Sequence, residues 1–136
     1  MEIVAWVSRH KPLPNQIFEL KKRLGEDVKI VQINKTFRDV KEVYNDIKSC
    51  GAKYAVVVLP LSMIAALAQY KDITWIWAEM EPVHGYSCPG EDLCTVFDPE
   101  RDVVLESPNF KRHLRFKEFR KIIKVEMVTE EWEGGE

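Results

Sequence analysis

The chain has 136 residues, of which 46% are hydrophobic and 31% are charged, and its formal net charge is −2. This length and composition fit one globular domain and argue against extended disorder. The opening "MEIVAWVSRH" lacks a basic lead before a long apolar run, and no stretch approaches the roughly 18 apolar residues that span a bilayer. We therefore expect a single domain over residues 1–136, located in the cytoplasm and without a membrane partner.

Apolar runs rich in β-branched residues alternate with helical patterns in the first part of the chain. Strands are predicted at "EIVAWVS", "VKIVQIN", "YAVVVLP" and "ITWIWAEM", and a helix is predicted after each of the first three. Pro14 suits the first turn of the first helix, and Gly25 suits its C-terminal cap. The alternation predicts an α/β fold with a mainly parallel, Rossmann-like sheet of about five strands flanked by helices.

The pattern changes after the fourth predicted strand. Residues 82–110 carry four prolines and two cysteines, and we interpret them as an ordered loop or excursion, because long structureless loops are uncommon in compact domains. Residues 109–124 hold seven Lys and Arg beside one Glu. Their alternation predicts a C-terminal strand or hairpin, with a bulge near Lys117 and Glu118 that returns the apolar residues to one face. Residues 129–136 form an acidic tail.

Polar and cationic side chains follow the predicted strands at the edge where open α/β sheets usually bind ligands. Arginine and lysine at such positions suit a phosphate or a carboxylate. Neither the dinucleotide fingerprint nor the Walker phosphate loop is present. Solvated strand ends also carry polar residues without binding anything. The candidate ligand-binding residues are Ser8, Arg9, His10, Asn34, Lys35, Ser62 and Glu79.

A second candidate surface is the outer face of the C-terminal strand, which we call the basic stripe. It would follow a nucleic-acid backbone, with Phe116 or Phe119 stacking on bases. It would equally protect an edge strand against unwanted pairing. Residues 79–106 hold eight acids against one arginine and could neutralise it. The basic stripe comprises His113, Arg115, Lys117, Arg120 and Lys124.

Two groups of residues raise the question of a metal. Glu79 and Glu81 alternate along a strand and could bind a divalent ion from the same side. "HGYSCPGEDLC" holds His84, Cys88 and Cys94, three possible zinc ligands, but the spacing of the cysteines is not that of a tight knuckle and a fourth ligand is not evident. A Cys88–Cys94 disulfide, or free thiols, is therefore favoured over a metal, and no metal or cofactor is expected.

The runs "MEIVAWVSRH", "VVVLPLSMIAAL" and "HLRFKEFRKIIKVEMVTEEW" give the chain a family resemblance. It resembles small Rossmann-like proteins from thermophilic archaea and bacteria and their mobile elements, a group without an established activity. The resemblance covers most of the chain except residues 85–110. It implies a fold and a hot habitat, without implying a reaction.

These observations favour a non-enzymatic, dimeric α/β module that recognises a phosphate-bearing partner. The partner would be a nucleotide at the strand ends or nucleic acid along the basic stripe. One alternative is a metal-dependent hydrolase or nuclease that uses Glu79 and Glu81, with His10 as acid or base. The other alternative is a structural or interaction protein that assembles as a homodimer.

Overall fold

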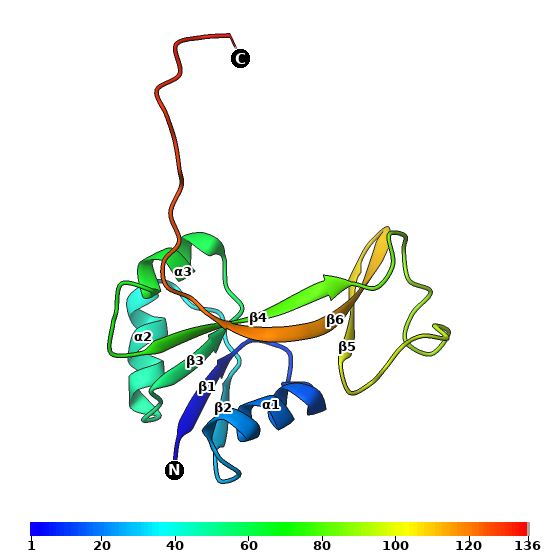
Figure 1. Cartoon of the computed structure of the whole chain (residues 1–136), viewed down its shortest axis with the longest axis horizontal. Coiled ribbons are helices and arrows are strands. Elements are labelled where there is room, and N and C mark those ends of the chain that lie inside the picture. Colours follow the sequence, from blue (N-terminus) through cyan, green and yellow to red (C-terminus); the bar gives the residue numbers. More distant parts are fainter. Residues whose placement is uncertain (136) are drawn as a thin grey trace.

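The computed structural model describes residues 1–135, and Glu136, the last residue of the predicted acidic tail, lies outside them. Strands and helices alternate until the third helix and are followed by three successive strands (Figure 1). The elements are β1 (Ile3–Val7), α1 (Pro14–Leu24), β2 (Lys29–Ile33), α2 (Val40–Ser49), β3 (Tyr54–Val57), α3 (Leu61–Leu67), β4 (Thr74–Pro82), β5 (Asp102–Ser107) and β6 (Phe110–Lys121).

The protein is an α/β protein with one six-stranded sheet in the order β2-β1-β3-β4-β6-β5. β1 pairs in parallel with β2 and β3, and β3 pairs in parallel with β4. β6 then runs antiparallel to both β4 and β5. The sheet is therefore mixed, and the expectation of a mainly parallel sheet of about five strands was wrong, because the C-terminal part of the chain adds two strands and β6 runs antiparallel to both of its neighbours.

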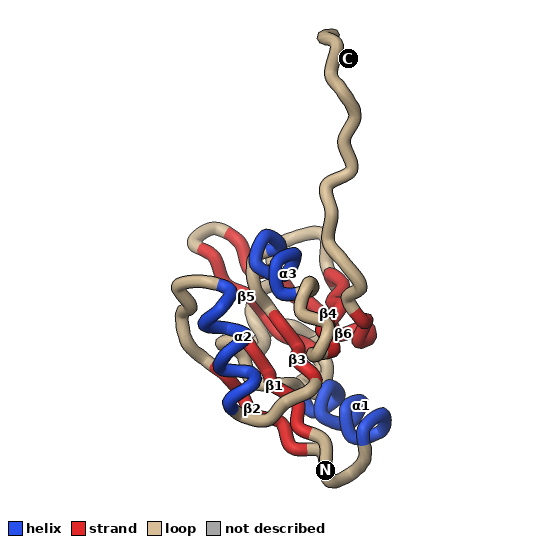
Figure 2. Tube along the Cα trace, turned by 90° about the vertical axis from the view of Figure 1, so that its left-hand side faces the viewer, coloured by secondary structure: helices blue, strands red, loops and turns tan. Residues whose placement is uncertain are grey.

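Helices cover both faces of the parallel half of the sheet (Figure 2). On one face α1 buries Leu20 against Val4, Trp6 and Val56. On the other face α2 and α3 supply a larger core, to which α2 contributes Val43 and Ile47, and α3 contributes Ile64 and Leu67. The continuous Val run of β3 is thus buried between two layers of helix, as its sequence indicated.

β4 and β6 extend beyond the helices and carry β5 at their far end (Figure 1). Their register shifts between Glu79, which pairs with Glu118, and Met80, which pairs with Phe116. Lys117 is therefore the extra residue, and the bulge predicted near it is confirmed. Of the two alternatives predicted for the C-terminal segment, the single bent strand is found, as β6. The hairpin that the structure contains is β5–β6, and β5 lies in residues that were assigned to the excursion. The loop proper covers residues 83–101.

None of the helices in residues 1–135 is both long enough and apolar enough to cross a bilayer.

The packing of α1 leads to a stability prediction with a control on the same helix. Leu20 is 2% exposed, whereas Phe18 is 60% exposed. We expect Leu20→Ala to lower the free energy of unfolding by about 2–5 kcal/mol, because it leaves a cavity in the core. Phe18→Ala should change it by less than about 0.5 kcal/mol. Urea unfolding followed by circular dichroism measures both, and equal effects would mean that α1 does not pack on the sheet as described.

Candidate metal centre and binding groove

Four side chains with metal-binding atoms converge at the far end of the sheet. His84, Cys88, Cys94 and His113 each offer one ligand atom, and these atoms all lie within 4.8 Å of one another. The Cys94 Sγ atom lies 3.4 Å from His84 Nε2 and 3.7 Å from His113 Nδ1, and the two histidine nitrogens are 3.0 Å apart. We call this group the His/Cys cluster.

The backbone around the His/Cys cluster is held against β6. The N–H of Val83 donates to the carbonyl of His113 at 2.9 Å, and the N–H of Cys88 donates to the carbonyl of Lys111 at 2.8 Å. The N–H of Gly90 faces the Cys88 sulfur at 3.5 Å, with φ of 115° at Gly90. Such a φ favours glycine.

A buried carboxylate orients one of the two histidines. Asp102 Oδ2 lies 2.7 Å from His113 Nε2, and Arg115 donates to both oxygens of Asp102, at 2.7 and 2.9 Å. Burial raises the pKa of Asp102, but hydrogen bonds from Arg115, from the backbone N–H of Asp98 and from His113 outweigh it and hold this pKa at about 2. The ionised carboxylate keeps the proton on Nε2, so that the lone pair of Nδ1 points toward the cluster.

The donor set suits a tetrahedral zinc ion, and its spacing comes close to that of one. Bonds of about 2.0–2.1 Å to nitrogen and 2.3 Å to sulfur place the ligand atoms roughly 3.3–3.8 Å apart around the metal. The separations within the His/Cys cluster run from 3.0 Å to no more than 4.8 Å, so they bracket this range and the longest would have to shorten around an ion. Two thiolates and two imidazoles also close the coordination sphere, which is typical of structural zinc sites. A carboxylate bonded to the second nitrogen of a ligating histidine is a common feature around such ions.

The structure thus places His113 beside the three possible ligands identified in the sequence, as a fourth possible ligand. His113 was assigned to the basic stripe, because its neighbours are cationic and its strand partner was unknown. The antiparallel pairing of β4 with β6 brings it beside His84, which follows the end of β4. A histidine in the strand that follows "HGYSCPGEDLC" was the available signal. Cys88 and Cys94 are free cysteines in the structure, as is Cys50.

The remaining members of the basic stripe are paired with carboxylates. Arg115 binds the buried Asp102, and the other partners are Glu79 for Lys117, Glu118 for Arg120 and Glu126 for Lys124. β5 pairs with Phe110–Arg115 of β6, so this part of the stripe is not an edge, whereas residues 117–121 have β4 as their one strand partner within residues 1–135 and still form an edge. Neutralisation by the segment 79–106, considered from the sequence, is found at Asp102 and Glu79.

Only part of the predicted strand-end site comes together. Ser8, Arg9 and Lys35 line a hollow of about 310 Å³ with Thr36 and Pro60. Lys35 is bound by Asp46 at 2.6 Å and Glu42 at 3.2 Å, and hydrogen bonds to these two acids raise its pKa. Asn34, Ser62 and Glu79 do not line this hollow.

The two glutamates proposed for a hydrolase are engaged separately in β4. Glu79 lies 3.8 Å from Lys117, and Glu81 pairs across the sheet with Arg115. Within residues 1–135 the His/Cys cluster is the one group of three or more metal-binding side chains, and it contains neither glutamate. His10 lies elsewhere, at the end of β1, where its N–H donates to Ser8 Oγ.

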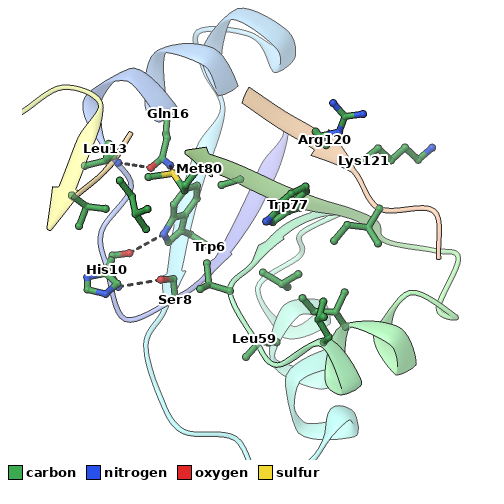
Figure 3. Close-up of a pocket in the computed structure, with 18 of the residues that line it drawn as sticks. Trp6, Ser8, His10, Leu13, Gln16, Leu59, Trp77, Met80, Arg120 and Lys121 are labelled. Atoms are coloured by element: carbon green, nitrogen blue, oxygen red, sulfur yellow. Dashed lines mark hydrogen bonds between the residues drawn. The ribbon is translucent and has the colours of Figure 1, made fainter. Parts of the chain in front are cut away.

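A groove of about 730 Å³ opens where β4 continues past the end of β3 (Figure 3). The last pair between these strands joins Val56 and Ile76, whereas β4 continues to Pro82. Most of the residues that line the groove are apolar, and none of them is acidic. We call it the apolar groove. Its aromatic and aliphatic walls include Trp6, Leu59, Leu61, Trp77, Met80 and Ile123, and its cationic residues are Lys11, Arg120, Lys121 and Lys124.

No protein-family model, no curated protein and no solved structure matches the chain. Its geometry alone defines the class of site, a Cys₂His₂ cluster on an α/β scaffold that also carries an apolar groove.

The hydrogen bond between Asp102 and His113 can be tested by mutation. We expect Asp102→Asn to weaken zinc or cobalt binding about 10–100-fold, because an amide holds the orientation and basicity of the imidazole less well. Competition with a chromophoric chelator measures the affinity. Asp98→Asn is the control on the adjoining turn. An unchanged affinity in Asp102→Asn would mean that this hydrogen bond does not hold His113 in place for the ion.

Proposed function

We propose that this protein is a zinc-stabilised α/β binding module, in which a structural zinc ion fixes the loop 83–101 against the β5–β6 hairpin. The observation that carries the proposal is the convergence of His84, Cys88, Cys94 and His113, whose ligand atoms all lie within 4.8 Å of one another. Four protein ligands leave no coordination position for a substrate, and this favours a structural ion over a catalytic one.

The loop gives a reason why an ion would be needed. Residues 83–101 contain no strand or helix, and loops of this length are uncommon unless something orders them. Cys88 and Cys94 lie within this loop, whereas His113 lies on β6. An ion bound to all of them would join the loop to the sheet, and its binding free energy would become part of the folding free energy of this region.

The first experiment measures zinc content. Protein produced with zinc and freed of loose metal should hold one equivalent, and cobalt should replace it with the absorption bands of a tetrahedral site containing thiolates. Cys88→Ser and Cys94→Ser should lose the ion and melt at a lower temperature. Cys50→Ser is the matched control, because Cys50 lies at the end of α2, away from the cluster.

Alkylation of the denatured protein without a reductant separates the metal site from the disulfide that the sequence favoured. Release of the ion from a zinc site leaves all three cysteines reactive, whereas a Cys88–Cys94 disulfide leaves only Cys50 reactive. Native protein that contains no zinc, takes up no cobalt and shows only one reactive cysteine would contradict the proposal.

A second candidate function is recognition of a phosphate group at the strand ends, on a Rossmann-like arrangement of β1–β4. It is favoured by the hollow beside Arg9, which has Ser8 and Thr36 as further polar lining residues. Arg9 is exposed and forms no ion pair with residues 1–135, so its guanidinium is available to an anion. Lys35 contributes less, because Asp46 and Glu42 already neutralise it.

Thermal-shift measurements with mono- and dinucleotides test this second function. A ligand that binds the folded state raises the melting temperature by mass action. We expect an upward shift that is reduced at high salt and lost in Arg9→Ala, and retained in Arg23→Ala, an arginine of α1 outside the hollow. No shift with any nucleotide in the native protein would remove this candidate and leave the zinc proposal untouched.

A further inference from the structure

The chain ends in an extended segment that leaves the body of the protein (Figures 1 and 2). We call residues 126–135 the arm. Its three large apolar side chains are almost fully exposed, at 88% for Met127, 87% for Val128 and 76% for Trp132. The arm holds four glutamates and no Lys or Arg. The exposed apolar side chains favour burial against another apolar surface, and the glutamates favour a surface that is basic.

The apolar groove has the complementary character. Val58, Leu61, Trp77 and Ile123 line it and are all exposed large apolar residues. Its charged lining residues are all cationic, and Lys11 and Lys121 form no ion pair within residues 1–135. Opposite charges on two apolar surfaces favour their association and fix its register. The groove therefore fits an acidic segment with bulky apolar side chains.

Backbone geometry points in the same direction. Beyond Ile76 no strand within residues 1–135 pairs with the edge of β4 that faces β3, although β4 continues to Pro82. An extended peptide can add to such an edge as a further strand, with alternate side chains entering the pockets beside it. The arm is already extended where it leaves the body, so little reordering would be needed to use this edge.

We propose that the arm of one copy of the chain binds in the apolar groove of a second copy, and the reverse, so that two arms are exchanged in a symmetric dimer. The base of the arm, residues 122–125, already lines the groove of its own copy. Return of the arm into that groove would require a sharp reversal, yet residues 126–133 contain neither glycine nor proline. When each copy places its arm in the groove of the other, both grooves are filled and the assembly stops at two copies.

Sedimentation of the full chain tests the exchange. We expect a dimer whose dissociation constant rises at least about tenfold in Trp132→Ala and in Lys121→Glu, since each removes a central contact. The matched controls are Phe18→Ala, an exposed aromatic outside the arm and the groove, and Lys22→Glu, an exposed lysine of α1 with the same change of charge. Raised salt should also weaken the dimer.

A mixing experiment distinguishes exchange from other contacts. In a mixture of Trp132→Ala and Lys121→Glu, the mixed dimer has one intact arm–groove pair and one pair that carries both substitutions. If Trp132 and Lys121 meet in the same groove, their losses there are less than additive, so mixed dimers should form more tightly than the mean of the two variant dimers. Glu131→Lys should restore part of the affinity lost in Lys121→Glu. The proposal would be overturned if the full chain stayed monomeric at all concentrations, or if neither variant weakened the dimer. It would also be overturned if the arm bound the groove of its own copy within a monomer.

Discussion

The position of β6 between β4 and β5 is the constraint on which both candidate sites depend. This strand pairs with β4 through the bulge at Lys117 and with β5 beyond it. Its far half presents His113 and Arg115 to Asp102, and its near half presents Arg120 and Lys121 beside Trp77 (Figure 3). A shift of register by one residue would turn each of these side chains to the opposite face. The bulge therefore fixes which side chains of β6 face Asp102 at one end of the strand and which lie beside Trp77 at the other.

Asp102 organises the charged side chains around the His/Cys cluster. It is a buried acid with a histidine on one oxygen and an arginine on both. The ion pair with Arg115 offsets the cost of burying the carboxylate, and the bond to His113 uses the remaining negative charge to orient an imidazole. Three cationic residues of β6 thus pair with acids of β4 and β5: Lys111 with Glu106, Arg115 with Asp102 and Lys117 with Glu79.

The sequence was sufficient to predict the strands and helices of the first half. Strand and helix patterns there depend on local periodicity, and Pro14 and Gly25 mark the ends of α1 as expected. The bulge near Lys117 was also predictable, because two phases of alternation meet there. Strand order was not, since nothing local to "HLRFKEFRKIIK" indicates whether that strand joins the main sheet or stands apart.

The same limit explains the incomplete prediction of the candidate metal centre. His84, Cys88 and Cys94 are close in sequence and were identified together. His113 and Asp102 join them only through the pairing of three strands, which no spacing rule expresses. The apolar groove was missed for a related reason. It exists because β4 continues past the end of β3, and its walls come from elements at both ends of the chain.

The division of the His/Cys cluster between loop and sheet also has a kinetic meaning. The loop between His84 and Cys94 closes over few residues, at a small entropic cost, so three ligands can meet before the sheet is complete. His113 lies on β6 and would join them only once β6 has paired with β4. A metal held by the loop would carry one open position until then. Filling that position would mark the last stage of assembly, and withdrawal of His113 would be the first step by which the far end of the sheet comes apart.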